Sequence, residues 1–141
     1  MFGLRSAALA LLAVVIAAAP GCSRKISDAS VRTISTAEVA SRVRPSGSGP
    51  TLIDVRAAAE FRDGHIPGAV NLRLSDVSAD ERDPLPASIA GRSSIIVYGR
   101  DPGDGLANAM AKRLLARGVK NVQLFEGGYS AWLASGGMPA R

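Results

Sequence analysis

Cysteine is almost absent from this sequence. The 141 residues contain one, Cys22, so the chain cannot form an internal disulfide. Aromatic residues are also few, with three phenylalanines, two tyrosines and one tryptophan, and the single histidine is His65. The net charge is +5, but the basic residues are scattered and are not interleaved with aromatic ones. We therefore expect no nucleic-acid interface.

The sequence also lacks an apolar run long enough to cross a bilayer. Its longest, residues 7–19, has thirteen residues without a polar side chain, whereas a spanning helix needs roughly 18 or more. This run follows a short basic start, and small residues lie between it and Cys22. That order is typical of an export signal. We predict a signal peptide of lipoprotein type over residues 1–21 and a tether over residues 22–32.

The residues before Cys22 resemble the lipobox of bacterial lipoproteins, in which cleavage leaves the cysteine as the N-terminus and its sulfur carries a diacylglyceryl group. Ala19 and Pro20 depart from the usual lipobox. An ordinary cleaved signal with a free thiol and an uncleaved anchor therefore remain as alternatives. The resemblance implies that membrane lipid is a partner through acylated Cys22, that the protein is exported to the bacterial envelope, and that it faces the periplasm. Ser23 slightly favours the outer membrane.

From residue 33 onward, strand-like and helical patterns alternate. Short apolar runs predict strands near residues 51–55, 69–72, 95–97 and 121–125. Helices are predicted from a capping box at Ser35, after Ser75, and in the segments 57–61, 106–118 and 126–137. The alternation predicts one α/β domain over residues 33–141 with a mostly parallel sheet.

The helix predicted over residues 106–118 has an apolar face at helical spacing, formed by Leu106, Ala109, Met110 and Leu114. A glycine-rich loop precedes this helix. In the loop, glycine permits a positive φ, and Asp104 is placed to cap the helix.

Ligands of parallel sheets bind outside the carboxyl ends of the strands. Two segments follow predicted strands at such ends, the loop 99–105 and the residues after the second strand. The candidate binding residues are Gly99, Arg100, Asp101, Gly103, Asp104, Gly105, Asp54 and Arg56. The two loop aspartates lack the spacing of a calcium loop, so we predict no metal site. Nothing in the sequence predicts a cofactor.

Three segments together resemble the rhodanese-like domain family. They are LIDVRAAAEFRDGHIPGAVNL (52–72), IIVYG leading into AMAKRLLARGVKNVQLFEGG, and YSAWLASGGMP. The resemblance covers roughly residues 34–139. It implies a three-layer fold, with helices on both faces of a central, mostly parallel sheet. Active members of the family carry a cysteine at the first position of the loop, where it holds sulfane sulfur as a persulfide.

Gly99 occupies the position at which the resemblance places that cysteine. Two aspartates in the loop would oppose a bound anion, since like charges repel. The resemblance therefore implies a domain without a catalytic residue, acting as a binding module for an envelope protein or a small polar ligand. The alternative is a sulfurtransferase that uses another residue. By the same resemblance, His65 and the pair Asp54 and Arg56 are chiefly structural, and we expect Trp132 in the core.

Overall fold

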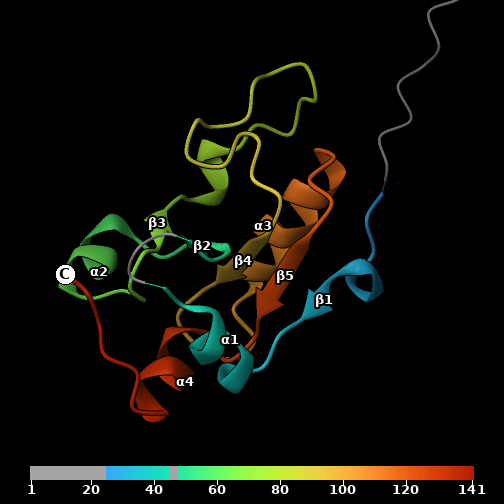
Figure 1. The fold of residues 1–141 in the computed structure, drawn as a ribbon. Coiled ribbons are helices and arrows are strands. Elements are labelled where there is room, and N and C mark those ends of the chain that lie inside the picture. The colour runs from blue at the N-terminus through green and yellow to red at the C-terminus, as the bar shows by residue number, and fades with distance from the viewer. Residues whose placement is uncertain (1–24, 45–47) are drawn as a thin grey trace, which may run out of the picture.

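The computed structural model describes residues 25–44 and 48–141, where five strands form one parallel sheet. The strand order across the sheet is β1-β5-β4-β2-β3 (Figure 1). The bounds are β1 Arg32–Thr33, β2 Thr51–Asp54, β3 Val70–Asn71, β4 Ile95–Tyr98 and β5 Val122–Phe125. The predicted signal peptide and Cys22 lie outside the described residues. No helix among the described residues has the length and apolar character needed to cross a membrane.

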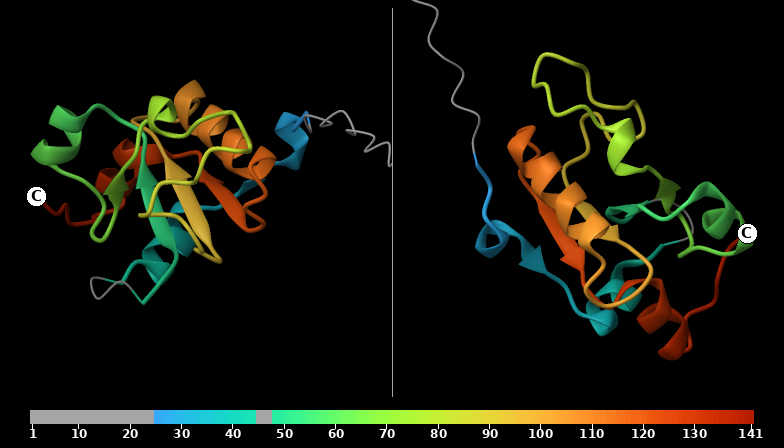
Figure 2. Two further views of the ribbon diagram at one scale, coloured as in Figure 1. Left: turned by 90° about the horizontal axis from the view of Figure 1, so that it is seen from above. Right: turned by 180° about the vertical axis from the view of Figure 1, so that it is seen from behind.

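Helices cover both faces of the sheet (Figures 1 and 2). The longest, α3, packs on one face, while α1 and α4 lie side by side on the other. The bounds are α1 Thr36–Arg42, α2 Ala58–Asp63, α3 Gly105–Ala116 and α4 Gly128–Ala134, with 3-10 turns η1 Asp28–Ser30 and η2 Leu74–Asp76. The α/β fold with a central parallel sheet flanked by helices is confirmed.

Strand β4 shows how the sequence builds the two layers. Its four residues are fully buried, and successive side chains of a strand point to opposite faces. Ile95 and Val97 belong to the core beneath α3. Ile96 and Tyr98 belong to the core beneath α1 and α4, which also contains Trp132. A strand covered on both faces has a continuous apolar sequence, which is why this run was visible in the sequence.

The predicted helix caps are confirmed. The Ser35 hydroxyl accepts the N–H of Glu38, and the Glu38 carboxylate accepts the N–H of Ser35. Asp104 caps α3 as predicted. The prediction that Leu106 belongs to the apolar face of this helix is wrong, because its side chain is 54% exposed. It stands in the first turn of α3, and the face toward the sheet begins at Ala107 instead.

Two short elements correct the predicted boundaries. Arg32 and Thr33 form β1, which pairs with β5, and η1 precedes it, so the range predicted as a tether, residues 22–32, includes a 3-10 turn and the first residue of a strand. A strand of two residues shows no periodicity, which is why this segment resembled a linker. The short helix predicted after Ser75 is instead the 3-10 turn Leu74–Asp76.

Candidate functional site

The glycine-rich loop follows β4 directly and is fixed to the start of α4. Tyr129 donates its backbone N–H to the Gly99 carbonyl, and Ser130 donates to the Arg100 carbonyl, both at 2.9 Å. Gly128 permits this close approach, because its φ is +63° and a Cβ there would lie 2.9 Å from the Arg100 carbonyl. These bonds therefore fix the first two residues of the loop to α4.

The Asp104 carboxylate fills the space in front of Gly99. Its Oδ1 accepts the N–H of Leu106 and its Oδ2 accepts the N–H of Arg100, both at 2.9 Å. A Cβ at position 99 would lie 2.7 Å from the Asp104 Cβ and nearer still to the carboxylate. Real Cβ atoms do not approach so closely. The carboxylate thus occupies two N–H groups that could otherwise hold a bound anion, and it leaves no room for a side chain at position 99.

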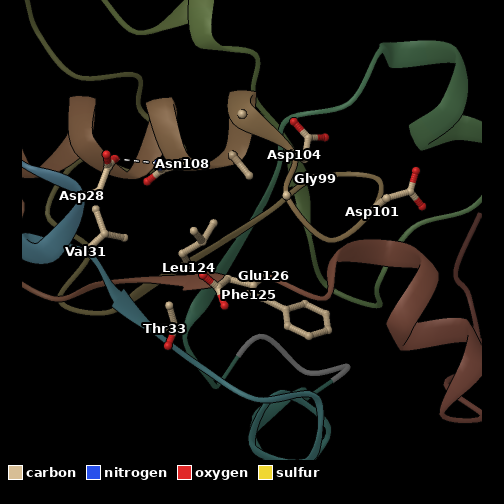
Figure 3. Close-up of a pocket in the computed structure, with 13 residues that line it drawn as sticks. Asp28, Val31, Thr33, Gly99, Asp101, Asp104, Asn108, Leu124, Phe125 and Glu126 are labelled. Carbon is tan, nitrogen blue, oxygen red and sulfur yellow. Dashed lines mark hydrogen bonds between the residues drawn. The ribbon is translucent and has the colours of Figure 1, made fainter.

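A pocket of about 200 Å³ lies between the loop, β5 and the N-terminal segment (Figure 3). We call it the β5 pocket. Four carboxylates and no basic side chain line it, together with apolar residues of β5 and α3. Its lining residues are Asp28, Val31, Thr33, Gly99, Asp101, Gly103, Asp104, Gly105, Ala107, Asn108, Leu124, Phe125 and Glu126.

The four carboxylates of the β5 pocket differ in their partners. Asp28 Oδ1 accepts from Asn108 Nδ2 and Lys112 Nζ, both at 2.8 Å. The hydrogen bond from Lys112, followed by that from Asn108, lowers the pKa of Asp28. In the described part of the chain, Asp101 and Glu126 have no side-chain partner. No group of three or more metal-ligating side chains is found among the described residues.

A second pocket, of about 430 Å³, lies on the other side of the loop, against α2. We call it the α2 pocket. The Arg100 guanidinium crosses it to Glu60, with Nε and Nη2 at 2.8 and 2.6 Å from Oε1. Its lining residues are Arg56, Ala57, Glu60, Arg100, Asp101, Pro102, Gly103, Asp104 and Leu106.

Asp54 and Arg56 form the predicted charge pair, and it is buried. Arg56 Nη2 lies 2.6 Å from Asp54 Oδ2 and donates to the Gly64 carbonyl at 2.8 Å. Its guanidinium stacks over the Tyr129 ring, 4.0 Å from the centroid. Burial opposes the charge of Arg56, but the hydrogen bonds and charge of Asp54 outweigh it and raise the Arg56 pKa. Asp54 lines neither pocket. Of the two predicted residues, Arg56 therefore lines the α2 pocket while its guanidinium is already paired, and Asp54 is buried and reaches neither pocket.

The side chains of His65 and Tyr98 could transfer protons, but both make structural contacts. His65 stacks on Phe61, contacts the Phe61 carbonyl through Nδ1 at 2.9 Å, and pairs its backbone with Ala140. Burial, reinforced by the charge of Asp54, raises the pKa of Tyr98, whose hydroxyl accepts the N–H of Ile66. No cysteine, serine or histidine of the described residues lines either pocket.

The structure brings together most of the predicted loop residues and adds others. Glu126 follows β5 at the same edge of the sheet, so the rule that selected the loop would have found it. Asp28 and Asn108 are 80 positions apart, and nothing in the sequence signals their contact. Val31 and Thr33 were missed because β1 was missed.

Known proteins resemble this chain over most of its length. A model of the rhodanese-like domain family matches residues 36–135. A thiosulfate sulfurtransferase of Corynebacterium glutamicum is 32% identical over 120 residues, which cover 68% of this chain and 39% of that protein. Thiosulfate sulfurtransferase 16 of Arabidopsis thaliana, a chloroplastic protein, is 33% identical over 100 residues, which cover 67% of this chain and 82% of that protein.

Solved structures show the same fold. The rhodanese-like domain of an Anabaena protein is 30% identical, with a TM-score of 0.60, and the match covers 77% of each chain. A Rhodopseudomonas palustris protein of unknown function is 27% identical, with a TM-score of 0.66, covering 80% of this chain and 87% of that one. The chain spans 39% of the corynebacterial relative and 44% of a Mycobacterium tuberculosis relative. The fold, the family model and the relatives agree: this chain belongs to the rhodanese-like domain family.

Proposed function

We propose that this protein is a rhodanese-like binding module without sulfurtransferase activity. The observation that carries the proposal is the position of the Asp104 carboxylate, which fills the space in front of Gly99 and accepts the N–H groups of Arg100 and Leu106. Gly99 lies where the resemblance places the family's nucleophile. The loop therefore has no thiol, and two N–H groups that could hold an anionic sulfur donor are already occupied.

The β5 pocket supports a small cationic group as the ligand. Four carboxylates line it without a basic side chain, and two of them, Asp101 and Glu126, have no partner among the described residues. Its volume of about 200 Å³ is below the roughly 300–1,000 Å³ of pockets for drug-sized ligands. An amine, or one lysine or arginine side chain of a partner protein in the envelope, fits that size and charge.

The proposal places this module in the bacterial envelope, attached to membrane lipid through an acylated Cys22 and facing the periplasm. The sequence of residues 1–22, with its basic start, apolar run and lipobox-like end, supports this location and the lipid anchor. Two or more acyl chains would hold the protein firmly, whereas one chain binds marginally. Mass spectrometry of the N-terminal peptide of protein extracted from bacterial membranes is expected to find a diacylglyceryl group on Cys22. A free thiol there would contradict the lipid anchor.

A thiosulfate:cyanide sulfurtransferase assay tests the absence of catalysis. We expect the purified full-length chain to form thiocyanate no faster than the uncatalysed background. The Cys22→Ser variant is the matched control, because it removes the single thiol of the chain without touching the described domain. We expect the two proteins to give the same result.

The names of the relatives favour a second candidate, a sulfurtransferase that uses another residue, since two of them are thiosulfate sulfurtransferases. Turnover above background that survives Cys22→Ser would establish this candidate and refute the binding module. Turnover lost in Cys22→Ser would assign the chemistry to the N-terminal thiol.

A further inference from the structure

We infer that the N-terminal segment 25–33 is a detachable strap, and that its docking completes the β5 pocket. This inference deepens the proposed function and partly rests on it. The strap supplies one wall of the pocket, through Asp28, Val31 and Thr33 (Figure 3). The opposite walls come from the loop, α3 and β5. Removing the strap would leave this half of the site open to solvent.

The strap is held by few contacts. Neither η1 nor β1 contains a buried residue, and Val31 is only partly buried against the main core. Its backbone pairs with β5 at two positions, Arg32 with Gln123 and Thr33 with Leu124. The side-chain anchors are Asp28 to Asn108 and Lys112, and Arg32 to Asn121 Oδ1 at 2.6 Å. Exposed pairs of this kind contribute little each. By contrast, the next residue, Ile34, is 4% exposed and donates its N–H to the Leu124 carbonyl. The strap therefore ends at a firm hinge.

Weak anchoring gives the strap a local opening equilibrium well below the energy of global unfolding. A ligand that touches both the strap and the loop favours the docked state, and by linkage the docked state binds that ligand more tightly. Asp28 takes part in both ligand binding and strap docking, because it lines the pocket and also anchors the strap to α3.

The strap lies close in sequence to the proposed lipid anchor at Cys22. Cys22 precedes Asp28 by six residues, and a chain of that length spans at most about 20 Å. If Cys22 is lipidated as proposed, the membrane anchor lies within that distance of the pocket wall. Displacement of the anchor relative to the domain would then act on the strap first.

Amide hydrogen exchange of the full-length chain tests the strap with a charge swap. Lys112→Glu places like charges together, and we expect exchange of residues 28–33 to become about fivefold faster, while the amides of β4 are unchanged. The double variant Asp28→Lys/Lys112→Glu restores the pair with its charges reversed and is expected to return exchange close to the parent rate. Arg62→Glu is the control, because it makes the same charge change at an exposed position on α2, which lies on the opposite side of the molecule from β1 (Figure 1).

The outcomes separate the strap from the proposed ligand. Unchanged exchange in Lys112→Glu, or faster exchange throughout the domain, would overturn the detachable strap, as would failure of the swap to restore the rate. Two probes with the same alkyl chain, n-butylammonium and n-butanesulfonate, then test the pocket in the parent chain. Slower strap exchange with the cation alone supports the coupling. Slowing by the anion, or by neither probe, would refute the proposed cationic ligand while the charge-swap result still stands for strap docking.

Discussion

Replacing Gly99 by cysteine is expected to lower the free energy of unfolding by about 1–3 kcal/mol, the usual range for overpacking, and to produce no sulfur transfer. The introduced Cβ would lie 2.7 Å from the Asp104 Cβ and closer to its carboxylate. The fold must then displace Asp104, which caps α3 and holds the Arg100 N–H. Denaturant unfolding in a Cys22→Ser background measures the change, with the introduced thiol as the one cysteine present.

The double variant Gly99→Cys/Asp104→Gly is expected to be more stable than Gly99→Cys alone. Glycine in place of a capping aspartate costs only a few tenths of a kcal/mol, and it removes the carboxylate that blocks position 99. The thiolate then faces the N–H groups of Arg100 and Leu106 at the start of a twelve-residue helix, an arrangement that lowers the pKa of a thiol. We expect iodoacetamide to react faster at neutral pH with the double variant than with the single one.

Gly105→Cys is the matched control for this pair, because a Cβ at position 105 meets no atom within 4 Å. We expect it to leave the stability nearly unchanged. If Gly99→Cys proved as stable as Gly105→Cys, the Asp104 carboxylate would not fill the space in front of Gly99, and the structural basis of the proposed function would be lost.

Replacing Asp54 by alanine is expected to lower the free energy of unfolding by about 3–5 kcal/mol, the cost of leaving a buried charge unpaired. Arg56 is 6% exposed and Asp54 is fully buried. The remaining contacts of the guanidinium are the Gly64 carbonyl and the Tyr129 ring, and neither carries a charge. Urea unfolding of Asp54→Ala measures the loss.

The chain contains its own control for this experiment. Asp80 and Arg82 have the same spacing, and Arg82 Nη2 lies 2.6 Å from Asp80 Oδ2, the distance found for Arg56 and Asp54. This second pair is exposed, so Asp80→Ala should change the stability little. Adding Arg56→Met to Asp54→Ala removes the unpaired charge and should recover part of the loss. Equal effects of Asp54→Ala and Asp80→Ala would show that burial does not decide the strength of the pair.

Much of the fold was predictable because its signals are local. The continuous apolar run of β4, the Ser35 capping box and the Asp104 cap depend on neighbours in the sequence. The elements that were missed or misplaced are short: β1 has two residues and η2 has three. Segments of this length are too short to show an apolar periodicity in the sequence. They form only because they pair or pack with residues far away in the chain.

The site was predictable in position but not in its internal contacts. The rule that ligands bind at the carboxyl ends of parallel strands selected the loop 99–105, and residues of this loop line the β5 pocket. It could not show that the Asp104 carboxylate turns back to the Arg100 N–H, because this depends on the path of the loop. It also placed Asp54 among the binding residues, although Asp54 is sealed beneath Arg56.

The two outer strands of the sheet, β1 and β3, have two residues each, while the three strands between them have four. Exposed sheet edges invite strand addition by other chains, and short edge strands are one way in which proteins limit it. If the strap detaches, the β1 side loses this protection, and the four residues of β5 become a free edge. The same segment that completes the pocket would then also guard the molecule against self-association, so concentration-dependent aggregation should rise together with strap opening.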